Sequence, residues 1–218
     1  MLPACGLALF LAGCPEGDKK PTVTRDRSQA VLGSSAPDPT PTPATASAPP
    51  VKKAPRQLCA GQMGKSGRDM PKGAISRVAA PGATEPPKAV PVGGGKWTWI
   101  NFWAAWCVPC KEELPRLIGW EKKLNAEGKP FRLVLVTLDD DQRQLEDFLK
   151  AQSAGGVKST YWLKEGKERE EWLTDLGIST DPELPAHVVV DPRGKARCTV
   201  NGAVEDDDYG QLVALVGG

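Results

Sequence analysis

The stretch from Trp97 to Lys111 constrains the fold of this 218-residue chain more than any other. It reads WTWINFWAAWCVPCK, so aromatic and β-branched residues are followed by two cysteines at C-x-x-C spacing. The residues from Glu112 onward then have a helical period. This order predicts a buried strand, a tight turn and a helix that begins at the cysteines.

Cys107 and Cys110 are the candidate reactive residues. Two cysteines in the first turn of a helix can close a small disulfide ring. The unpaired N–H groups and the positive end of the helix dipole favour a thiolate there. We therefore expect Cys107 to have a lowered pKa and to act as a nucleophile. Cys110, one turn later and less exposed, is placed to attack a mixed disulfide formed on Cys107.

Zinc binding is the alternative use of this spacing. A tetrahedral zinc site would need a second close cysteine pair or two histidines. The chain has one histidine, His187, and Cys59 and Cys198 are far apart in sequence. Redox chemistry is therefore favoured over zinc, and no metal site is expected.

The sequence WCVPC, preceded by NFWAA and followed by KEELPRL, resembles the thioredoxin superfamily. Within that superfamily the chain resembles the membrane-anchored TlpA/ResA-like thiol-disulfide oxidoreductases, over about residues 70–218. The resemblance implies an α/β fold, a thioredoxin-like three-layer α/β/α sandwich with a mixed central sheet. It also implies a thiol-disulfide oxidoreductase that needs no cofactor.

Leu184–Pro185 is the second landmark of the resemblance. In the family this proline is cis and faces the C-x-x-C motif across the substrate groove. A cis bond turns the preceding backbone outward, where an incoming peptide can pair with it. The expected substrate-binding residues are Trp106, Leu184 and Pro185, and Pro185 also belongs to the expected catalytic set. The alternative is a proline that merely starts a strand.

Asn101 stands where thioredoxins have a buried aspartate that helps to deprotonate the second cysteine. Asparagine cannot accept a proton, so Glu113 or water must do so, or resolution is slower. TlpA-like proteins often combine this asparagine with a glutamate at the position of Glu113, which makes Glu113 a catalytic candidate. A surface helix carboxylate remains the alternative. His187 is either a packed structural residue or a charge near the groove.

The dipeptide Val108-Pro109 carries neither a charge nor a polar donor. Strong oxidants of the superfamily place a histidine inside the motif, which stabilises the thiolate and the reduced form. Without one, Cys107 is expected to be less acidic. The protein should then be a weaker oxidant and a better reductant.

The N-terminus resembles a bacterial lipoprotein signal. Residues 5–13 are apolar but too short to span a bilayer, and Leu11-Ala12-Gly13-Cys14 resembles a lipobox. No Lys or Arg precedes the apolar run, and a plain secretory signal is the alternative. We expect a signal peptide over 1–13, a lipid on Cys14, and a periplasmic or cell-envelope location that permits disulfides.

The rest of the chain is expected to divide into a linker over 14–57 and a thioredoxin-like domain with an N-terminal extension over 58–218. The linker is rich in Pro, Ala, Thr and Ser and is predicted to be disordered. We expect a short hairpin between Leu58 and Gly95 and a helix cap in solvent at Asp139-Asp140-Asp141. Apolar periodicity predicts strands at 97–104, 131–138, 186–191 and 196–201, and helices after Cys107, after Asp141, at 167–176 and at 205–216. Residues 159–163 are expected to form either a short strand or an extended connection.

Cys59 and Cys198 remain once the other cysteines have roles, because Cys5 leaves with the signal and Cys14 carries lipid. In an oxidising compartment they are expected to pair, with Cys198 in an edge strand of the sheet. The alternatives are a second redox pair that relays electrons to Cys107–Cys110, and two free thiols.

The predicted function is reduction of disulfides in exported proteins, with a membrane thiol carrier as the electron donor. Family members often serve cytochrome c maturation or copper-site assembly, which suggests the same substrates here. The alternative is a Cu(I)-handling chaperone that uses the two cysteines as soft ligands. The net charge is +1, so no nucleic-acid partner is expected. A monomer is expected, held at a membrane by its lipid.

Overall fold

The structure is a computed structural model that describes residues 57–59 and 62–217. The expected signal peptide, Cys14 and nearly all of the expected linker lie outside the described residues. None of the described helices is long and apolar enough to cross a membrane.

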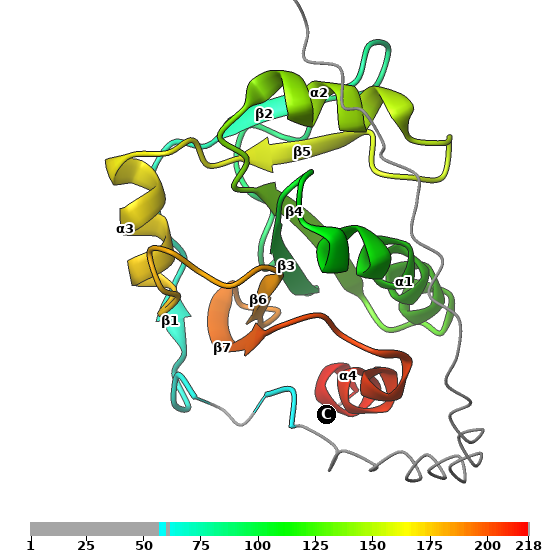
Figure 1. Cartoon of the computed structure of the whole chain (residues 1–218). Helices are drawn as coiled ribbons and strands as arrows, with labels where there is room; N and C mark the ends of the chain where they lie inside the picture. Colours follow the sequence, from blue (N-terminus) through cyan, green and yellow to red (C-terminus); the bar gives the residue numbers. More distant parts are fainter. Residues whose placement is uncertain (1–56, 60–61, 218) are drawn as a thin grey trace, which may run out of the picture. The chain divides into compact units, whose positions relative to one another are not determined.

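The described chain folds around one mixed sheet (Figure 1). Its seven strands are ordered β1-β7-β6-β3-β4-β5-β2. The strands are β1 (Arg68–Asp69), β2 (Ser76–Ala79), β3 (Trp97–Trp103), β4 (Phe131–Thr137), β5 (Ser159–Trp162), β6 (Ala186–Val190) and β7 (Lys195–Asn201). The central strand β3 pairs in parallel with β4 and antiparallel with β6. This arrangement confirms the mixed sheet and the α/β class.

Helices cover both faces of the sheet. They are α1 (Val108–Ala126), α2 (Gln142–Ala151), α3 (Lys167–Asp175) and α4 (Tyr209–Val216), with a 3-10 turn, η1 (Asp206–Asp208), before α4. Trp99 of β3 packs into a cluster with residues of α1 and α4, whereas Ile100 and Phe102 pack into one with residues of α3. Successive residues of a strand point to opposite faces, so β3 is covered on both sides. Figure 1 shows α3 across the sheet from α1.

The predicted elements from Trp97 onward are confirmed. Along α1, the apolar residues Leu114, Leu117 and Leu124 are buried, whereas Ile118 is only partly buried. The hairpin of β6 and β7 turns at Pro192-Arg193-Gly194, where Gly194 has a φ of 82° that L-residues rarely adopt.

The expected hairpin before the central strand is wrong. β1 pairs with β7 and β2 pairs with β5, so the two short strands lie at opposite edges of the sheet. The connection between β1 and β2 does not form a hairpin turn. Its residues Met70 and Ile75 pack instead against the core cluster on the α3 side of the sheet. The Trp172 indole also donates to the Gly73 carbonyl at 3.3 Å.

β7 is not the edge strand that was expected for Cys198. The segment before β1 also pairs with it: the Met63 N–H donates to the Arg197 carbonyl at 3.2 Å, and the Thr199 N–H donates to Gln62 Oε1 at 3.1 Å. The N-terminal extension therefore covers the backbone groups that an edge strand would leave unpaired.

Candidate active site at the Cys107–Cys110 disulfide

Cys107 and Cys110 form a disulfide at the start of α1. Cys107 is the N-cap of the helix, and its Sγ accepts a hydrogen bond from the Cys110 N–H at 3.2 Å. Cys107 is 4% exposed and Cys110 is fully buried, so the first cysteine is the one nearer to solvent. A backbone N–H that points at Cys107 Sγ would stabilise a thiolate there once the bond is reduced.

The residues on either side of Cys107 form an apolar rim. Trp106 is 54% exposed and Val108 is 57% exposed, and they are the large hydrophobic side chains that stand exposed in the described part of the chain. Exposed apolar side chains beside a reactive group are typical of a surface that contacts another protein.

Leu184–Pro185 lies against the same site. The peptide bond is cis, and it leads directly into β6. Leu184 is partly buried and packs against the cluster that contains both active-site cysteines, while Pro185 is buried. The structure thus brings this dipeptide and the C-x-x-C motif together from distant parts of the sequence.

A buried polar cluster includes one residue of α1, the helix that begins at the cysteines. It joins Asn101 of β3, Glu113 of α1 and His187 of β6, and all three side chains are fully buried. Asn101 Nδ2 donates to Glu113 Oε1 at 2.6 Å, and the Val204 N–H donates to Glu113 Oε2 at 2.9 Å. Glu113 is therefore not the exposed surface carboxylate that was the alternative prediction for this residue. Glu113 is three residues after Cys110, a spacing that places both on one face of the helix.

The contacts of His187 determine its tautomer. The Trp99 indole N–H donates to Nδ1 at 3.0 Å, and Asn101 Nδ2 lies 3.1 Å from the same atom. A nitrogen that accepts a hydrogen bond carries no proton, so the proton of the neutral ring lies on Nε2. Nε2 faces the Gly202 carbonyl at 3.3 Å and Glu113 Oε2 at 3.6 Å. His187 is a packed member of the cluster, in line with the structural reading of this residue.

Comparison with known families covers the stretch that builds this site. Residues 94–196 match the family model described as thioredoxin-like. This stretch is a thioredoxin-like domain. It contains β3, the cysteines, α1 and the Leu184–Pro185 bond.

Two relatives are similar to this chain over part of its length. The thiol-disulfide oxidoreductase ResA of Bacillus subtilis is 27% identical over 122 residues, which are 55% of this chain and 62% of ResA. The thiol:disulfide interchange protein HelX of Rhodobacter capsulatus is 30% identical over 113 residues, which are 52% of this chain and 56% of HelX. The chain thus spans less than two thirds of either relative.

A solved structure gives a further comparison. The thiol:disulfide interchange protein of the thioredoxin family from Chlorobium tepidum TLS is 19% identical. The match has a TM-score of 0.48 and covers 69% of this chain and 98% of that one.

Asp139 is a buried residue of the thioredoxin-like domain that the sequence did not reveal. It was expected to cap a helix in solvent with its two neighbours, but only Asp141 does so, accepting from the Arg143 N–H at 2.8 Å. Asp139 is fully buried, and both its oxygens lie 3.0 Å from the Ala105 N–H, in the loop that leads to Cys107. Its place at the end of β4 was the signal, because the carboxyl ends of parallel strands meet at one edge.

Burial raises the pKa of Asp139, although hydrogen bonds from Thr137 and the Ala105 N–H oppose the rise. In Asp141, by contrast, the backbone N–H groups of Arg143 and Gln144 hold the pKa below its usual range. The pKa values of Asp139 and Asp141, two residues apart, are therefore shifted in opposite directions from those of an unfolded chain.

Cys59 and Cys198 also form a disulfide, with their Cα atoms 5.6 Å apart. It is separate from the active site. Cys59 packs against the same core cluster as Trp97, the first residue of β3, whereas Cys107 follows the other end of that strand. The described residues hold no group of three or more His, Cys, Asp or Glu side chains arranged to bind a metal.

We predict that Asp139→Asn changes how stability depends on pH. A carboxyl group whose folded pKa is raised contributes stability below its unfolded pKa of about 4, and that contribution is lost as pH rises through the folded pKa. The free energy of unfolding of the wild type, relative to Asp139→Asn, should therefore fall as the pH rises above about 4. Denaturant unfolding of the oxidised protein measures it.

Asp141→Asn is the matched control. Its folded pKa is lowered, so the wild-type side chain contributes stability above about pH 4 that is lost as pH falls. The wild-type advantage over Asp139→Asn should decrease above about pH 4, whereas its advantage over Asp141→Asn should increase with pH up to about pH 4 and stay level above it. Parallel curves would show that Asp139 is not held in a desolvated site.

Proposed function

We propose that the thioredoxin-like domain is a thiol-disulfide oxidoreductase that reduces disulfides in exported proteins. The observation that carries the proposal is the Cys107–Cys110 disulfide at the start of α1, with its nearer-to-solvent sulfur between the exposed Trp106 and Val108. ResA is named a thiol-disulfide oxidoreductase and HelX a thiol:disulfide interchange protein, which supports the same chemistry here.

The reaction begins from the reduced cysteines. The Cys107 thiolate attacks one sulfur of a substrate disulfide, the substrate bond breaks, and the other substrate sulfur leaves as a thiolate. The Cys110 thiolate then attacks Cys107 Sγ and releases the second substrate sulfur. Two electrons pass from the cysteine pair to the substrate, whose sulfurs take up protons. A thiol donor at the membrane then restores the cysteine pair.

Glu113 is the proposed proton acceptor for Cys110. Both side chains are fully buried and lie on one face of α1, so a proton leaving Cys110 has little access to water. The two N–H donors, from Asn101 and Val204, stabilise the ionised form of the carboxyl that must accept the proton.

The substrate chain is proposed to lie along Leu184–Pro185. The Leu184 side chain is partly buried against the core cluster that contains Cys107 and Cys110, which supports this placement. Trp106 and Val108, which flank Cys107 in the chain, supply exposed apolar contact. The site thereby recognises a short extended segment around a disulfide rather than a particular folded surface.

We predict that Cys107→Ser abolishes reduction of a protein disulfide such as that of insulin in the presence of a thiol reductant. Cys110→Ser should keep the first attack and accumulate a mixed disulfide, because the resolving thiol is absent. Full activity in Cys107→Ser would contradict the assignment. Partners trapped on Cys110→Ser in cells would identify the substrates.

The measured reduction potential should lie nearer to about −270 mV than to about −120 mV, because the residues between the cysteines provide no charge.

We predict that Glu113→Gln slows resolution of the mixed disulfide by about 10- to 100-fold at neutral pH, since a positioned base is lost. The first attack by Cys107 should change much less. Rapid-mixing kinetics with a chromogenic disulfide separates the two steps. Glu112→Gln is the control, because it removes the neighbouring exposed carboxylate from the same helix. Equal slowing in both variants would exclude the proposed role of Glu113.

The domain is proposed to be held at a membrane by a lipid on Cys14, with residues 14–57 as the spacer and 58–218 as the domain. The lipobox-like Leu11-Ala12-Gly13-Cys14 motivates this proposal. Cys14→Ala should move the protein from the membrane fraction to the soluble fraction of the cell envelope. If the variant stays membrane-bound and uncleaved, another segment is the anchor.

A further inference from the structure

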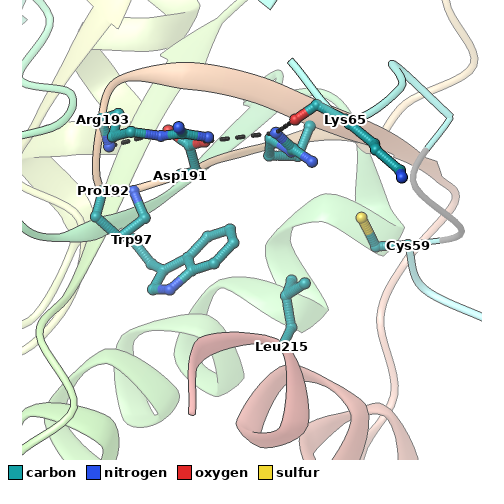
Figure 2. Close-up of a pocket in the computed structure, with 8 residues that line it drawn as sticks. Cys59, Lys65, Trp97, Asp191, Pro192, Arg193 and Leu215 are labelled. Atoms are coloured by element: carbon teal, nitrogen blue, oxygen red, sulfur yellow. Dashed lines mark hydrogen bonds and ion pairs between the residues drawn. The ribbon is translucent and has the colours of Figure 1, made fainter. Parts of the chain in front are cut away.

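A cavity of about 450 Å³ opens beside the Cys59–Cys198 disulfide (Figure 2). In Figure 2, Cys59 and Lys65 lie on one side of it and Trp97, Pro192 and Arg193 on the other, with Leu215 below. The cavity therefore lies near Trp97 at the start of β3, whereas the proposed active site follows the end of that strand. The lining residues are Cys59, Lys65, Trp97, Asp191, Pro192, Arg193, Arg197 and Leu215.

The two sulfurs of this disulfide differ in access. Cys198 is fully buried in the cluster between the sheet, α1 and α4. Cys59 is only partly buried and lines the cavity. A thiolate that enters the cavity therefore meets Cys59 Sγ, and Cys198 is the sulfur that would leave.

The cavity lining is cationic. Lys65, Arg193 and Arg197 provide three positive charges against the one carboxylate of Asp191, which leaves two positive charges in excess. Asp191 lies 3.4 Å from Arg193 Nη2 and 3.6 Å from Arg197 Nη1, so it holds both guanidinium groups at the wall. Burial alone would raise the pKa of Asp191. Hydrogen bonds from the N–H groups of Lys195 and Arg193 outweigh that effect and lower it, so the carboxylate stays charged.

A β-bulge places Arg197 in this lining. Val189 pairs with Cys198 and Val190 pairs with Ala196, so Arg197 is the extra residue of β7. A bulge re-aims the side chain of the residue that it inserts. Arg197 reaches Asp191 and also donates from Nη1 to the Lys65 carbonyl, which ties the N-terminal extension to β7 at this point.

We propose that this cavity binds anionic low-molecular-weight thiols, those that carry a carboxylate or sulfonate, and directs them onto Cys59–Cys198 as a second thiol-exchange site. The bound thiolate attacks Cys59 Sγ and forms a new S–S bond, while the Cys59–Cys198 bond breaks and Cys198 leaves as a thiolate. The ligand's thiol and the protein disulfide become a mixed disulfide and a protein thiol, so no external oxidant is required. The step does not depend on Cys107 or Cys110.

The test compares thiols that differ in charge. The full-length Cys107→Ser/Cys110→Ser variant is treated with 2-mercaptoethanesulfonate, an anion, or with 2-mercaptoethylamine, a cation. Peptide mass analysis follows the rate of adduct formation at Cys59, corrected for the thiolate concentration of each reagent. The same two reagents acting on 2-hydroxyethyl disulfide, which is neutral, give the intrinsic rate ratio. We expect the anion-to-cation ratio at Cys59 to exceed this reference by about tenfold at low salt and to decrease in 0.5 M KCl.

Charge variants locate the effect. In the same background, Lys65→Gln/Arg193→Gln should reduce the ratio towards the reference, whereas Lys88→Gln/Lys122→Gln removes the same charge outside the cavity and should leave it unchanged. The proposal is overturned if no adduct forms at Cys59, if the adduct forms on Cys198, or if the wild-type ratio equals the reference. An equal loss in both charge variants would also overturn it, because net charge rather than the cavity would then set the ratio.

Discussion

The pairing of β3 with both of its neighbours is the constraint on which the proposed active site depends. Parallel pairing with β4 sets Trp103 opposite Thr137, so the loop to Cys107 and the buried Asp139 leave the sheet at the same edge. Antiparallel pairing with β6 sets Asn101 opposite His187 and brings Pro185 to that edge as well. A shift of one residue in either register would turn these side chains to the other face of the sheet and separate them.

Two carboxyl groups, Glu113 and Asp139, are buried close to the cysteines. Burial of an ionised carboxylate costs several kcal/mol unless donors compensate it. Each of the two has a backbone N–H aimed at it, from Val204 and Ala105 respectively. They differ in placement, since Glu113 shares a helix face with Cys110 whereas Asp139 supports the backbone of the loop before Cys107. The first is suited to move a proton, and the second to hold the loop in position.

Much of the domain follows from patterns within single segments. The aromatic run and the C-x-x-C spacing predicted the strand, the turn and the start of α1, and apolar periodicity predicted the elements after it. The hairpin before β3 could not be judged in this way, because Met70 and Ile75 are placed by contacts with distant core residues. Asp139 was missed for a related reason: three consecutive aspartates are equivalent in sequence, and only the end of β4 distinguishes the first. The burial of Glu113 stayed open because Glu112 and Glu113 are adjacent on one helix.

The Cys59–Cys198 bond joins residues 139 positions apart, and so it closes most of the described chain into a covalent ring. Synthesis runs from the N-terminus, so Cys59 has no partner until β7 has been made. The extension that covers the edge of β7 is therefore among the last parts of the domain to be secured. Once the ring is closed, a protease that cuts a single loop inside it releases no fragment, because the two ends remain linked through sulfur. The bond thus protects the domain against separation after a cut as well as against unfolding.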